Sequence, residues 1–109
     1  MTGYKVAGGK VFVNVAIGDG QIGDSVVFID DDPIIMGAVN NLELGLGQEL
    51  VGKILRVKTV ATDAVDETNL TSVTWRLSGG AIPYLEGRQK EVENEGDSAV
   101  YRARFAFAS

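Results

Sequence analysis

The sequence contains no cysteine and no histidine, and only two of its 109 residues are proline. Without cysteine the chain has neither a disulfide nor a thiolate site, which leaves its redox compartment open. Without histidine it lacks the usual general base and the commonest metal ligand. A hydrolase would need two carboxylates, a Ser-Lys pair or a metal. Paired carboxylates suit glycoside hydrolysis, but the acidic residues fall in loops or charged runs rather than in an apolar pocket. We therefore expect no enzyme, with a small carboxylate-based hydrolase as the alternative, and no cofactor other than a calcium ion.

Positive charge is also scarce, since 15 acidic residues outnumber 10 basic ones and the net charge is −5. Binding to nucleic acid depends on neutralising phosphates, so neither nucleic acid nor an anionic membrane surface is an expected partner. No apolar run approaches the length of a membrane span. The opening residues, MTGYKVAGGK, lack the apolar region of a secretory signal, which favours a cytoplasmic location.

Low proline content and many β-branched side chains instead predict an ordered β-sheet protein. Three stretches, residues 55–61, 71–77 and 99–107, place mainly apolar side chains at odd-numbered positions. Successive side chains of a strand point to opposite faces of a sheet, so each stretch predicts one buried face and one wet face. Trp75 and Phe105 lie on the faces that are predicted to be buried.

Residues 53–80 predict a long antiparallel hairpin, because turn-forming Asp and Asn residues separate two of these stretches. With Val57 opposite Trp75, the apolar side chains of the two strands share one face. The same register places Arg56 opposite Arg76, and like charges directly opposite each other destabilise a sheet. We therefore expect carboxylates from a neighbouring strand, a bound anion, or a different register.

The remaining pattern predicts further short strands, at residues 10–17, 25–29, 33–36 and 42–46, and less regular edge or exposed strands near residues 4–7 and 81–95. The total is about seven to nine strands, with turn signals about every ten residues. The predicted fold class is therefore all-β: a single domain, residues 1–109, forming an antiparallel β-sandwich that is immunoglobulin-like or a related Greek key.

Basic side chains supply the first candidate site. Five of them are predicted to point away from the apolar faces: Arg56, Lys58, Arg76, Arg102 and Arg104. If their strands share a sheet, its outer face is a basic patch on an acidic protein, suited to docking an acidic protein partner. The alternative is cross-strand pairing with nearby glutamates, and such exposed ion pairs contribute little stability.

Acidic loops supply the second candidate site. Its candidate ligands are Asp30, Asp31, Asp32, Asp63 and Asp66. Calcium takes about six to eight oxygen ligands, which loops at one end of a sandwich can converge to provide. The alternative is that these aspartates are ordinary turn residues.

The sequence thus predicts a non-catalytic interaction or accessory module that binds a protein partner through a sheet face or through loops. A calcium-dependent ligand-binding sandwich is the alternative. Short exposed strands with few prolines also invite edge pairing, so self-association into a homodimer fits the sequence as well as a monomer does.

Overall fold

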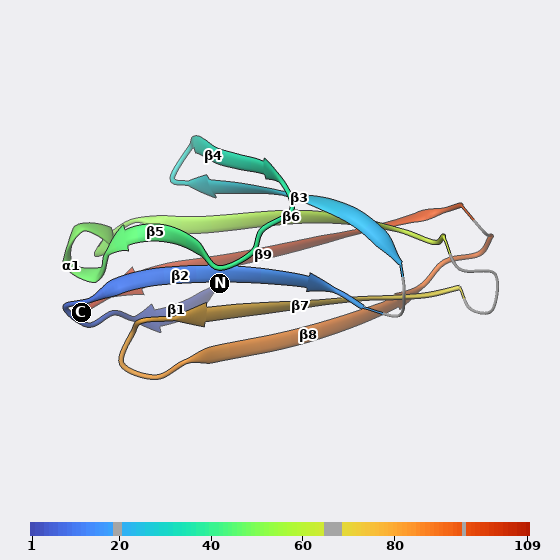
Figure 1. Cartoon of the computed structure of the whole chain (residues 1–109). Helices are drawn as coiled ribbons and strands as arrows, with labels where there is room; N and C mark the ends of the chain where they lie inside the picture. The colour runs from blue at the N-terminus through green and yellow to red at the C-terminus, as the bar shows by residue number, and fades with distance from the viewer. Residues whose placement is uncertain (19–20, 65–68, 95) are drawn as a thin grey trace.

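A computed structural model of the chain describes residues 1–18, 21–64, 69–94 and 96–109. These residues form nine strands and one short helix: β1 (Thr2–Lys5), β2 (Lys10–Ile17), β3 (Ile22–Ile29), β4 (Asp32–Gly37), β5 (Leu42–Leu46), α1 (Gly47–Leu50), β6 (Ile54–Thr62), β7 (Leu70–Ser78), β8 (Tyr84–Glu91) and β9 (Ser98–Ala108). Figure 1 shows most strands running along the long axis of an elongated body that measures 45 × 25 × 22 Å.

The strands form two sheets. One has five strands in the order β1-β9-β6-β3-β4, and the other has four in the order β5-β2-β7-β8. Every neighbouring pair is antiparallel except β1 and β9, which run parallel. The sheets enclose a cluster of buried apolar side chains. The prediction of an all-β sandwich is therefore confirmed.

The two halves of the chain contribute to the sheets in the same way. Strand β5 lies beside β2 and β9 lies beside β6, while β3 pairs with β4 and β7 with β8. If each strand from β2 to β5 is replaced by the strand four places later, and each from β6 to β9 by the strand four places earlier, the order β5-β2-β7-β8 becomes β9-β6-β3-β4. The two halves therefore have the same topology, although the sequence shows no repeat. As a result, each sheet is built from strands of both halves.

The core follows the alternation that the sequence displays. Every odd-numbered residue of 55–61, 71–77 and 99–107 is buried. Trp75 is 0% exposed and Phe105 is 1% exposed, so both are core residues as predicted. The Tyr101 hydroxyl lies 2.6 Å from Thr71 Oγ1, and this buried hydrogen bond joins β9 of one sheet to β7 of the other. The sheets are thus linked by packing and by a specific polar contact.

The predicted hairpin of residues 53–80 is wrong. Strand β6 pairs with β3 and β9 in the five-stranded sheet, whereas β7 pairs with β2 and β8 in the other. Both strands do bury their odd-numbered side chains, but from opposite sides of the core. Alternation cannot distinguish these arrangements, because it reports only that one face of each strand is dry. Arg56 and Arg76 are consequently not neighbours.

Other local predictions fare better. The strand predicted at residues 42–46 is confirmed as β5, although β3 begins at Ile22 rather than at residue 25. The single helical turn α1 was not expected, and it buries Leu50 beneath one end of the sandwich. Within the described ranges, no helix has the length and apolarity that crossing a membrane requires.

Candidate functional site

Four of the five predicted cations lie together on the outer face of the five-stranded sheet. Arg56 and Lys58 belong to β6, and Arg102 and Arg104 belong to the adjacent strand β9. The register places Arg56 opposite Arg104 and Lys58 opposite Arg102. These four residues are called the basic cluster. All four occupy even-numbered positions, whose side chains alternate with the buried odd-numbered ones.

The directions of the backbone carbonyls show that both cation pairs are non-hydrogen-bonded pairs, the narrow kind in which the two Cα atoms lie closer together. Arg88 Nη1 donates to the Arg102 carbonyl at 2.9 Å from the side of β9 opposite β6. A carbonyl that points away from the neighbouring antiparallel strand marks a non-hydrogen-bonded pair, with Cα atoms about 4.5 Å apart. Two residues further on, Arg104 and Arg56 form the same kind of pair. The backbones that carry these like charges therefore lie as close together as an antiparallel ladder brings them.

Little in the described structure neutralises this cluster. Arg56 contacts Asp31 at 3.7 Å, but the Asp31 side chain is fully exposed, so the ion pair is weak. The Arg56 guanidinium also lies 4.8 Å from the centre of the Phe28 ring. A hollow of about 260 Å³ lies here, lined by the four cations together with Phe28, Val57 and Ala103. It is a shallow basic surface with an apolar border.

Arg76 does not belong to the basic cluster. It lies in β7, opposite Asn14 on one side and Leu85 on the other. Its strand belongs to the four-stranded sheet, and the outer faces of a sandwich point in opposite directions. The sequence therefore indicated which cations are exposed, but not which of them share a face.

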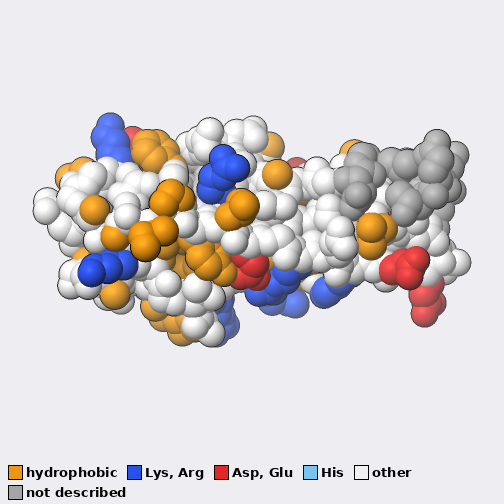
Figure 2. Space-filling model, turned by 90° about the horizontal axis from the view of Figure 1, so that it is seen from below, with side chains coloured by type: hydrophobic (Ala, Val, Ile, Leu, Met, Phe, Trp, Pro, Cys, Tyr) orange, Lys and Arg blue, Asp and Glu red, His pale blue; other side chains and the backbone are white. Residues whose placement is uncertain are grey.

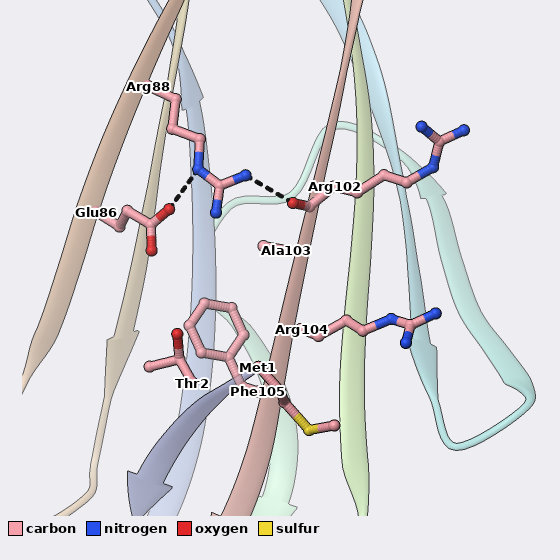
Figure 3. Close-up of a pocket in the computed structure, with 8 residues that line it drawn as sticks. All are labelled: Met1, Thr2, Glu86, Arg88, Arg102, Ala103, Arg104 and Phe105. Atoms are coloured by element: carbon pink, nitrogen blue, oxygen red, sulfur yellow. Dashed lines mark hydrogen bonds and ion pairs between the residues drawn. The ribbon is translucent and has the colours of Figure 1, made fainter.

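A second concavity of about 330 Å³ lies between β8 and β9. Its lining residues are Met1, Thr2, Glu86, Arg88, Arg102, Ala103, Arg104 and Phe105. Figure 3 shows Glu86 and Arg88 together on the β8 side, while the side chains of Arg102 and Arg104 point away over the neighbouring strands. We call this concavity the edge slot. Sequence reasoning missed Glu86 and Arg88, and the alternating charges of the predicted exposed strand were the only signal.

Glu86 is held ionised by its neighbours in the edge slot. The Tyr84 hydroxyl donates to Glu86 Oε1 at 2.5 Å, and Arg88 Nε donates to Glu86 Oε2 at 2.5 Å. The bond from Tyr84, opposed by partial burial and assisted by Arg88, lowers the pKa of the Glu86 carboxyl below its ordinary value. The same bond, together with burial, raises the pKa of the Tyr84 hydroxyl.

Glu86 is the only acidic residue among those that line four concavities of the described structure. Both of its oxygens already accept hydrogen bonds.

The predicted calcium ligands are divided between the two ends of β6. Asp30 accepts a hydrogen bond from the Ile54 amide through its carboxylate, and its own amide donates to the Ile54 carbonyl, both at the start of β6. Asp31 belongs to the same turn, and Asp32 begins β4. Asp63 follows the other end of β6, about 30 Å away along the strand. Asp66 lies outside the described residues. The structure thus does not bring Asp30–Asp32 and Asp63 together.

Asp63 has an unusual environment. It is 1% exposed, and neither of its carboxylate oxygens has a hydrogen-bond partner among the described residues. Its backbone is well bonded, because its amide donates to Asp97 and its carbonyl accepts from Gly96, each at 2.9 Å. Burying a carboxylate without a partner is costly. No group of three or more acidic side chains suited to a metal ion occurs among the residues that the structure describes.

Charge is distributed unevenly over the surface. Exposed acids Glu91, Glu93 and Asp97 lie where β8 ends and β9 begins. Figure 2 shows red side chains beside the grey atoms at one end of the molecule, while a further red one lies in the middle next to blue side chains.

No family model, curated protein or solved structure matches this chain. What the molecule offers for a function is thus its own geometry: a flat basic face, an edge slot beside it, and one unsatisfied buried carboxylate.

Proposed function

We propose that the protein is a non-catalytic interaction module that docks an acidic protein partner on the basic cluster. The observation that supports this proposal is that Arg56 lies directly opposite Arg104 and Lys58 directly opposite Arg102 on the neighbouring strand. Four of the ten basic residues of an acidic chain stand there in two like-charge pairs. This arrangement opposes folding, so a role in binding accounts for it better than a role in stability does.

An anionic partner would relieve this repulsion. Carboxylates placed between the paired cations convert like-charge contacts into ion pairs, and the surrounding field accelerates encounter with an acidic surface. Phe28 of the apolar border, together with Val26, which is opposite Lys58, would add area that becomes buried on docking. Specificity would then come from charge, and part of the affinity from the apolar border.

The scaffold, in this proposal, is an immunoglobulin-like sandwich or a related Greek key. Its support is the return of β5 beside β2 and of β9 beside β6, since a fourth strand lying beside the first is the Greek-key relation. The strands between them in the chain lie in the opposite sheet. Such scaffolds present flat sheet faces to partners, as the basic cluster requires.

Charge reversal tests the docking proposal. The probe is poly-glutamate, titrated at about 50 mM salt against the wild-type chain, Arg104→Glu and the matched control Arg76→Glu. We expect Arg104→Glu to weaken binding about tenfold or more, and Arg76→Glu to change it less than about twofold. Both variants alter net charge equally, so equal weakening would contradict docking at the cluster, as would a failure of wild type to bind.

A calcium-dependent role is the second candidate, and buried Asp63 favours it. A cation beside Asp63 would satisfy two carboxylate oxygens that otherwise lack a partner. The melting midpoint should then rise in millimolar calcium relative to chelator in wild type but not in Asp63→Asn. An unchanged wild-type midpoint would remove this candidate.

Assembly is a separate proposal. The edge strand β4 leaves Ile34 and Met36 exposed, at 47% and 78%, so a homodimer remains an alternative to a monomer. Light scattering at several concentrations decides between the two states.

A further inference from the structure

We propose that the open edge of β9, residues 100–104, accepts an extended peptide segment with alternating acidic and apolar side chains as an added strand. The inference rests on the proposed function for the acidic chemistry of the partner. It goes further by stating how that partner is held: by backbone pairing beside the basic cluster as well as by charge.

The first support is that β9 is longer than the strand that covers its outer edge. Strand β9 has 11 residues, but β1 pairs only with the last part of it, from Phe105 to Ala108. On the other side, β6 pairs with β9 along the range from Ser98 to Ala106. Within the described chain, the first part of β9 thus has a strand on one side only.

The second support is the direction of the exposed backbone groups. The carbonyls of Val100 and Arg102 point away from β6, because Lys90 Nζ and Arg88 Nη1 reach them from β8 at 2.9 Å each. In an antiparallel ladder the amide of such a residue points the same way as its carbonyl. Val100 and Arg102 therefore direct both donors and acceptors toward the edge of β9 that faces away from β6, as a strand-addition site requires.

The third support is that a strand fits in this position. Strand β1 already occupies the same side of β9, and Thr2 lines the edge slot where β1 begins. The slot measures about 330 Å³ and continues the line of β1 along β9. The side chains of Arg88 and Lys90 now hold the carbonyls that an added strand would take over. Both side chains are long and the Arg88 side chain is 47% exposed, so Arg88 Nη1 and Lys90 Nζ can release these carbonyls while Arg88 Nε keeps its bond to Glu86.

Charge selects the occupant. An added strand would place alternate side chains on the outer face, next to Arg102 and Arg104, where carboxylates are favourable. The other side chains would face the slot, where Ala103 and Phe105 favour apolar groups. Glu86 is the one acid there, and Tyr84 and Arg88 already satisfy it. A second copy of β9 is disfavoured, because its own arginines would face these.

The test uses the full chain and a blocked eight-residue peptide of alternating glutamate and valine. Two control peptides carry N-methyl groups on all the glutamate or all the valine nitrogens, so each lacks the donors of one edge. We expect the unmethylated peptide to slow hydrogen exchange of the Val100 and Arg102 amides about tenfold or more. One control, and only one, should bind about tenfold more weakly, since only one peptide edge pairs with β9.

The outcomes separate the two proposals. If all three peptides bind equally and Arg104→Glu weakens each of them, strand addition is overturned and docking on the basic cluster stands. If poly-glutamate binds through the cluster while the alternating peptide does not, strand addition again fails alone. If none of these probes binds, both proposals fail. Slowed exchange at Val100 and Arg102, together with one deficient control, supports strand addition.

Discussion

Removing one cation from the basic cluster should stabilise the protein. The substitution Arg104→Gln keeps a long polar side chain but removes the charge that faces Arg56 in a narrow cross-strand pair. Two unit charges about 5 Å apart repel each other by about 0.8 kcal/mol in water. Cross-strand pairs in proteins contribute about 0.2–1 kcal/mol. We therefore expect the free energy of unfolding to rise by about 0.3–0.8 kcal/mol at low ionic strength.

Salt and a matched variant isolate this effect. Urea unfolding of wild type, Arg104→Gln and Arg76→Gln would be measured at about 10 mM and about 1 M salt, where screening lengths are about 30 Å and 3 Å. Arg76 faces Asn14 and Leu85, so its substitution makes the same change in net charge without relieving a like-charge pair. The increase in the free energy of unfolding should appear only for Arg104→Gln and only at low salt.

Two results would refute this reasoning. If Arg104→Gln destabilises the protein at low salt, the guanidinium contributes packing or pairing that outweighs repulsion. If Arg76→Gln gains as much stability, the effect belongs to the chain as a whole and the cluster has no special repulsion. Either result would also weaken the case that the cations are there for a partner.

Three further predictions concern the fold and the edge slot. Tyr101→Phe removes the hydroxyl that bridges the sheets and should lower the free energy of unfolding by about 1–2 kcal/mol in urea denaturation, as a buried hydrogen bond requires. Gly79→Ala should destabilise by about 2 kcal/mol or more, because φ is +90° and the added Cβ would meet the Lys10 carbonyl; Gly96→Ala, with φ +87° but open space, should cost less by the same assay. The pKa of Glu86 is lowered in the folded state, so its ionisation stabilises the protein above its unfolded pKa of about 4.3, and this contribution is lost as pH falls through the folded value. The stability difference between wild type and Glu86→Gln should accordingly shrink between pH 6 and pH 3 in thermal melts.

The sequence predicts what alternation controls and misses what strand partners control. Odd-numbered side chains such as Trp75 and Phe105 are buried as expected, because burial depends on the face of a single strand. The prediction of a hairpin was wrong, because the pattern of buried side chains is the same for two arrangements. Two strands can lie side by side in one sheet, or they can lie in different sheets and face each other across the core. Arg76 was grouped with the other cations for the same reason.

The candidate sites show a similar division. That Arg56 and Lys58 are outward-facing follows from the alternation, but that Arg102 and Arg104 lie directly opposite them depends on the pairing of β6 with β9. Those strands are separated in the chain by β7 and β8, so no local pattern reveals their register. The edge slot depends on where β1 stops along β9, which is a matter of tertiary packing rather than of composition.

The mixing of strands from both halves in each sheet has a consequence for how the protein folds. Neither β2–β5 nor β6–β9 contains enough neighbouring strands to complete a sheet, so each fragment alone should stay unstructured and the two should fold only on mixing. Residues 51–53, which link the two halves, are all exposed. At this link two chains could exchange their second halves by domain swapping and form an intertwined dimer in which both sandwiches are complete. The earliest productive event in folding is then a meeting of distant segments, which makes acquisition of the native state slow compared with proteins built from local contacts.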